Sequence, residues 1–154
     1  HADMALVQNP NDQYSMCLLG FALTCNGHVA KGQGYSIESL KLSPLAPEAC
    51  LFAVALGAYL EGNFADAVSG FARISGAYDE ILACLAAALW NLGQRDTARA
   101  AMQRFMALKR QKMADYPGND AEQWRSYLLR LIPITDHADV EKLFEGFRNA
   151  GLPV

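Results

Sequence analysis

Apolar residues recur at helical spacing along most of this chain. In the last third, Trp124, Tyr127, Leu128 and Leu131 fall on one face of a predicted helix. A second predicted helix carries Val140, Leu143, Phe144 and Phe147 in the same way. No stretch shows the sustained alternation of apolar and polar residues that predicts a half-buried strand. Ala and Leu, which are strong helix formers, dominate the apolar positions. The pattern predicts an all-α fold.

The helical segments are organised around three glycines, Gly27, Gly62 and Gly93, which lie 35 and 31 residues apart. Each is preceded by a matched pair of residues seven or eight positions earlier and followed by a small residue five positions later. The preceding pairs are Leu19-Gly20, Val54-Ala55 and Leu85-Ala86, and the small residues are Gly32, Ala67 and Ala98. Ser36, Phe71 and Met102 follow four positions further on. Such periodicity is typical of repeat proteins.

This spacing resembles the tetratricopeptide repeat (TPR), in which two antiparallel helices pack closely through small residues. The aromatic residue that opens the family motif is missing in all three blocks, so the repeats are degenerate. The resemblance implies a TPR-like α-solenoid, a superhelix of antiparallel helix pairs, with C-terminal capping helices. The predicted boundaries are 1–12 for the tail of an upstream repeat, 13–46, 48–78 and 79–108 for three repeats, and 109–154 for the capping helices.

The two predicted capping helices have clear start and stop signals. Asp120 with Gln123 resembles a capping box, and Pro133 ends that helix. Thr135 or Asp136 begins the next helix, and Gly151 fits a left-handed C-cap that is followed by Leu152.

The ending Glu141–Pro153 carries a second resemblance. Its residues EKLFEGFRNAGLP look like the ending of bacterial proteins that join a class III adenylate or guanylate cyclase, or a winged-helix regulator, to C-terminal TPR-like repeats. The segment Asn9-Pro10-Asn11-Asp12 also matches joints in those arrays. The resemblance implies an interaction module at the C-terminus of a larger cytoplasmic signalling protein, with a nucleotide cyclase as the first expectation. The sensory region of a winged-helix transcription regulator, or a free-standing TPR adaptor, is the alternative.

Charge and composition exclude several partner classes. The net charge is −3, 52% of the residues are hydrophobic and 19% are charged. Basic residues are scattered, which argues against direct binding of nucleic acid and against a polybasic membrane patch. The longest apolar stretch, 49–60, is too short to span a bilayer. We expect a cytoplasmic protein.

The cysteines Cys17, Cys25, Cys50 and Cys84 contain no CxxC pair. In a cytoplasmic protein they are expected to be buried, reduced thiols, and disulfides are the alternative.

No catalytic, cofactor-binding or metal-binding residue is predicted. His1, His28 and His137 lack ligand spacing, and no nucleophile elbow or phosphate-binding loop is present. Asp79 and Glu80 lie at a predicted helix N-terminus, where carboxylates complement the helix dipole. No residue of a cyclase active site can be assigned in this chain.

The TPR register places one set of side chains along a concave groove. The set is uncharged and mostly apolar, so a clamp for a peptide carboxylate is not expected. It comprises Tyr14, Cys17, Phe21, Thr24, Phe52, Leu56, Tyr59, Ala83, Ala87 and Trp90. Two alternatives remain open. The groove binds a protein or peptide partner, or it is filled by the C-terminal helices or by a second copy in a homodimer.

Overall fold

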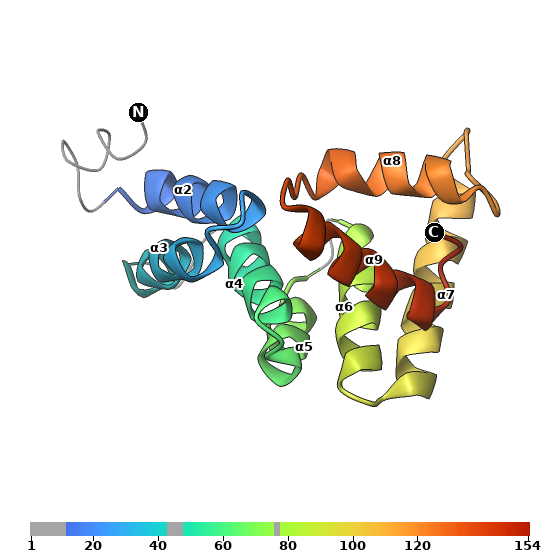
Figure 1. The fold of residues 1–154 in the computed structure, drawn as a ribbon, viewed down its shortest axis with the longest axis horizontal. Helices are drawn as coiled ribbons and strands as arrows, with labels where there is room; N and C mark the ends of the chain where they lie inside the picture. Colours follow the sequence, from blue (N-terminus) through green and yellow to red (C-terminus); the bar gives the residue numbers. More distant parts are fainter. Residues whose placement is uncertain (1–11, 43–47, 76–77) are drawn as a thin grey trace. The chain divides into compact units, whose positions relative to one another are not determined.

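The computed structural model describes residues 12–42, 48–75 and 78–154, and the described residues contain helices and no strands (Figure 1). The all-α prediction is therefore confirmed for these residues. The helices are α2 (Gln13–Cys25), α3 (Val29–Leu42), α4 (Glu48–Leu60), α5 (Phe64–Ala72), α6 (Glu80–Asn91), α7 (Arg95–Lys112), α8 (Ala121–Leu131) and α9 (His137–Ala150). They belong to two compact units, residues 1–74 and 75–154. The expected tail at residues 1–12 lies almost entirely outside the described residues.

Three helix pairs are joined by the same tight turn. Gly27, Gly62 and Gly93 have φ values of 78°, 84° and 88°, in the left-handed region that glycine adopts without a steric penalty. In each turn the residue after the glycine donates its N–H five residues back: His28 to Leu23 (2.9 Å), Asn63 to Ala58 (2.8 Å) and Gln94 to Leu89 (2.9 Å). These bonds satisfy carbonyls at the end of the first helix. The predicted turn glycines are confirmed.

In the first unit, α2 and α3 pack so closely that their crossing excludes side chains. A Cβ atom added to Gly20 would lie 2.8 Å from the carbonyl oxygen of Gly32 and 2.9 Å from the backbone nitrogen of Ser36. Helix α4 then packs against both α2 and α3, and α5 packs against α4 (Figure 1). The close crossing explains why small residues occupy these positions.

In the second unit, α6 and α7 form an antiparallel pair, and α9 packs against both (Figure 1). Helix α8 contributes Trp124, whose ring lies 5.6 Å from that of Phe105 on α7. The Trp124 indole N–H donates to the carbonyl of Gly118 at 3.0 Å. Large aromatic side chains from α7, α8 and α9 therefore form the core of this unit, with Phe105, Trp124, Phe144 and Phe147 almost fully buried.

The predicted ends of the last two helices are confirmed. Asp120 accepts a hydrogen bond from the backbone N–H of Gln123 at 3.0 Å, and Asp136 caps α9 by accepting from Ala138 and Asp139. Gly151 has a φ of 111° and ends α9 in the left-handed conformation. Leu152 is buried beside it. None of the described helices combines the length and apolar character that crossing a membrane requires.

Candidate functional site

The part of the predicted groove in the first unit is largely closed. Cys17 and Thr24 on α2, and Leu56 and Tyr59 on α4, are buried almost completely. Of the alternatives that the sequence left open, an open groove does not hold at these four residues, which are covered within their own unit. The physical reason is that α4 packs against α2 and α3 at once, so the inward faces of these helices are used within the unit. Thr24, for example, packs against Gly32 at the crossing of α2 and α3.

An exposed apolar surface remains on α2, which we call the α2 apolar face and define by Tyr14, Leu18 and Phe21. Their spacing of four and three residues puts them on one side of the helix. Tyr14 is 60% exposed and Leu18 is 46% exposed, and Phe21 is half-buried. The Phe21 ring lies 6.0 Å from that of Phe52 on α4. Two of the predicted groove residues, Tyr14 and Phe21, therefore contribute to this face, and Phe52 lies beside it. Leu18 was not predicted.

The part of the predicted groove in the second unit is covered by the chain itself. Ala83 and Ala87 on α6 have no exposed surface, and α9 packs along the same helix. Here the C-terminal helices fill the place expected for a partner. Ala83 and Ala87 therefore do not line an open groove, and a groove filled by the C-terminal helices was one of the alternatives that the sequence left open.

Trp90, the last predicted groove residue, lies near the end of α6 and is half-buried. The guanidinium carbons of Arg95 and Arg99, from the start of α7, each lie 5.3 Å from the centre of its ring. Stacking of this kind orders two long cationic side chains against one aromatic surface.

A cluster of charged side chains joins α6, α7 and α8 in the second unit. The ammonium of Lys109 contacts Glu80 and lies 3.3 Å from Asp79, and Lys112 donates to Asp79 at 2.9 Å. The Tyr127 hydroxyl also donates to Glu80. The Lys109 side chain and both carboxylates are about nine-tenths buried. Asp79 and Glu80 do lie at the start of α6, as expected, but their main partners are lysines from α7.

The cluster stabilises its charged forms. Burial by itself raises the pKa of Glu80, but the hydrogen bonds from Lys109 and Tyr127 outweigh it and hold that pKa below its usual range. Burial by itself lowers the pKa of the Lys109 ammonium. The hydrogen bond to Glu80 outweighs this effect, and the pKa of Lys109 is raised. A lysine nucleophile or general base needs a lowered pKa. The arrangement therefore suits a structural role.

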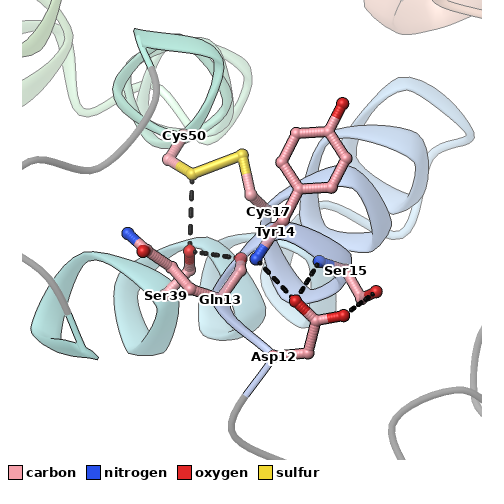
Figure 2. Close-up of a disulfide and its surroundings, with 7 residues drawn as sticks. All are labelled: Asp12, Gln13, Tyr14, Ser15, Cys17, Ser39 and Cys50. Carbon is pink, nitrogen blue, oxygen red and sulfur yellow. Dashed lines mark hydrogen bonds between the residues drawn. A yellow bond between two sulfur atoms is a disulfide. The ribbon is translucent and has the colours of Figure 1, made fainter. Parts of the chain in front are cut away.

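The prediction for the cysteines is wrong at two of the four positions. Cys17 on α2 and Cys50 on α4 form a disulfide, with their Cα atoms 5.2 Å apart (Figure 2). Beside them, the Ser39 hydroxyl lies 3.4 Å from the Cys50 sulfur and donates to the Gln13 carbonyl at 2.9 Å. The pair is formed by the packing of α4 on α2, and 33 residues separate its members in the sequence. Cys25 and Cys84 are buried thiols.

Burial raises the pKa of the Cys25 thiol to about 12, so it stays protonated and unreactive near neutral pH. Among residues 12–42, 48–75 and 78–154, no three His, Cys, Asp or Glu side chains come together as metal ligands.

Sequence comparison adds no family to this description. No model of a known protein family matches the chain, and no curated protein sequence matches it significantly.

Proposed function

We propose that this chain is a TPR-like protein-interaction module. The repeated geometry supports the repeat assignment, because three glycine turns with the same backbone hydrogen bonds join the helices of each pair. The residues at the two small positions of each pair are buried where the paired helices pack. These are Gly20 with Gly32, Ala55 with Ala67, and Ala86 with Ala98. In the first unit, a third helix packs against both members of the preceding pair, as stacked repeats do.

The observation that carries the binding function is the α2 apolar face. Tyr14 and Leu18 expose large apolar side chains next to one another on one side of a helix. Contiguous exposed apolar surface marks sites of protein association, and a helix face of this kind suits a second copy of the chain or an apolar segment of another protein.

The first test combines sedimentation velocity with selection from an unbiased peptide-display library. We expect self-association or selected peptides of micromolar affinity, and loss of both when Leu18→Glu places a charge in the α2 apolar face. Ile37→Glu is the matched control, because Ile37 is 40% exposed on α3, outside that face. A chain that stays monomeric at every concentration and selects no peptide would contradict the proposal.

The proposed setting is a larger bacterial signalling protein, a nucleotide cyclase or, as the alternative, a winged-helix transcription regulator. The resemblance of Glu141–Pro153 to the endings of such proteins supports it. Two residues of that segment also have a local structural role. Gly151 ends α9 in the left-handed conformation, and Leu152 is buried next to it. The proposal assigns no catalytic step to residues 1–154. Cyclic nucleotide formation by the purified chain would contradict this, and the coding sequence next to His1 would distinguish the two settings.

A further inference from the structure

One side of α7 carries three exposed arginines, Arg95, Arg99 and Arg110, which we call the α7 arginine strip. At about 100° per residue, their positions fall within roughly 60° around the helix. The strip spans about 22 Å from Arg95 to Arg110 at about 1.5 Å per residue. All three residues belong to the second unit.

Aromatic rings hold each guanidinium of the strip. Arg95 and Arg99 both lie 5.3 Å from the Trp90 ring centre, and Arg110 lies 5.4 Å from that of Tyr116. Stacking leaves the edges of a planar guanidinium, which carry its N–H donors, free to bind an anion. The strip is therefore ordered before any ligand arrives, which lowers the entropy lost on binding.

The positive charge of the strip is only partly neutralised within the described residues. Asp96 lies 3.7 Å from Arg99 and is itself fully exposed. Neither Arg95 nor Arg110 has a carboxylate within ion-pair distance in that part of the chain. The two lysines of α7 give a contrast, because Lys109 and Lys112 are paired with Asp79 and Glu80.

An open cavity of about 390 Å³ adjoins the C-terminal end of the strip. Gln103, Met106, Arg110, Tyr116 and Asn119 are among its lining residues. The lining combines two side-chain amides with a thioether and an aromatic ring. Such a mixed polar and apolar surface suits a peptide backbone and its apolar side chains.

We propose that the α7 arginine strip binds an extended acidic peptide segment of a partner protein. Carboxylates pair with the two ends of the strip, and the cavity accepts the side chain that lies next to Arg110. At about 3.3 Å per residue, roughly seven extended residues cover the strip. Arginine and tryptophan are also the side chains that most often dominate binding energy at protein interfaces. This surface is separate from the α2 apolar face, so the inference does not require that face to bind anything.

A protein ligand fits this surface better than a single-stranded nucleic acid. Bases bind by stacking on free aromatic faces, whereas Trp90 and Tyr116 are already covered by arginines of the chain. The net charge of −3 also opposes the approach of a polyanion much longer than the strip.

The test measures fluorescence anisotropy of a fluorescein-labelled nine-residue peptide of alternating Glu and Leu, titrated with the full chain. We expect saturable binding that weakens as ionic strength rises, because the contacts are exposed charges. The Arg95→Gln/Arg99→Gln variant and the Arg110→Gln variant should each weaken binding by about tenfold or more. The same peptide with Gln in place of Glu should not bind.

Arg104→Gln is the matched control. Arg104 is exposed on the same helix but lies about 180° around the helix from Arg95. Arg104→Gln therefore removes the same charge as a strip variant, at a position outside the α7 arginine strip. Circular dichroism and thermal midpoints confirm that each variant is folded. The proposal is overturned if the peptide fails to bind, if Arg104→Gln weakens binding as much as the strip variants, or if a fifteen-residue oligothymidine binds more tightly than the peptide. These measurements do not depend on the Leu18→Glu test. A negative result for the α7 arginine strip therefore does not contradict the proposal for the α2 apolar face.

Discussion

At Gly20 the requirement for glycine comes from space and not from backbone conformation. The residue lies inside α2, where glycine is unfavourable, yet a Cβ atom there would overlap the backbone of α3. Gly34, in the same pair of helices, gives the opposite case, because a Cβ atom there meets nothing within 4 Å. One substitution at the two positions should therefore have effects of opposite sign.

We expect Gly20→Ala to lower the free energy of unfolding by about 1–3 kcal/mol through overpacking at the crossing of α2 and α3. Gly34→Ala should raise it by about 0.5–1 kcal/mol, because alanine favours the helix and no contact is disturbed. Urea denaturation of the two variants measures both values. Equal effects at the two positions would show that the α2–α3 crossing is looser than described.

Glu80 shows how a buried charge becomes a pH-dependent contribution to stability. Its pKa is held below the usual value of 4.5 in the folded chain. A carboxylate with a lowered pKa stabilises the fold fully above its unfolded pKa. That contribution is lost as the pH falls through the folded pKa.

We expect Glu80→Gln to destabilise the chain by about 1–3 kcal/mol near neutral pH, because Lys109 loses its closest partner while Asp79 remains. The difference between wild type and variant should shrink as the pH falls from about 6 to about 3. Urea midpoints across this range test the expectation. A difference that stays constant with pH would mean that ionisation of the Glu80 carboxylate does not stabilise the fold.

At the scale of elements, the Cys17–Cys50 disulfide joins α2 to α4 and so ties one helix pair to the next. Packing alone already places these helices together, and the covalent bond restricts the unfolded chain as well. Persistent disulfides are typical of oxidising compartments and unusual in the bacterial cytoplasm. The cytoplasmic location inferred from sequence stays a prediction, and this bond argues against it.

Reduction of the disulfide should lower the free energy of unfolding by about 3–4 kcal/mol, the value expected for releasing a loop of this length. Urea denaturation with and without dithiothreitol measures the change. The Cys17→Ser/Cys50→Ser variant is the control, since the reductant should not alter its stability. A wild-type chain that is equally stable with and without dithiothreitol would contradict the expectation.

The elements themselves were largely predictable, because their signals are local. The turn glycines, the caps at Asp120 and Asp136, and the C-cap at Gly151 each act within a few residues of chain. The disulfide and the Glu80–Lys109–Tyr127 contacts were not predictable, because their members lie 33, 29 and 47 residues apart. Only the packing of helices against one another brings these side chains together.

At the scale of the whole molecule, the sequence predicted a continuous array over residues 13–108, whereas the compact units divide at residues 74 and 75. The boundary falls within the predicted second repeat, 48–78. Six of the ten predicted groove residues are buried inside one unit or the other. The sequence had left open that the C-terminal helices fill the groove, but family register could not indicate that the helices of the first unit would bury Cys17, Thr24, Leu56 and Tyr59 among themselves.

Each unit buries its own core, and both tryptophans, Trp90 and Trp124, lie in the second unit. Gly20→Ala, in the first unit, should therefore lower the unfolding midpoint seen by far-ultraviolet circular dichroism while leaving the midpoint seen by tryptophan fluorescence in place. Coincident shifts in both signals would show that the two units unfold as one cooperative structure.

The packing of α9 along α6 and α7 has a consequence for assembly. Repeat arrays can polymerise when each end offers a surface on which another helix pair can stack, as building blocks with two complementary ends do. In the second unit, α9 already packs against α6 and α7. For copies that associate through the α2 apolar face, as proposed above, α6 offers no exposed stacking surface, and we expect dimers and not filaments.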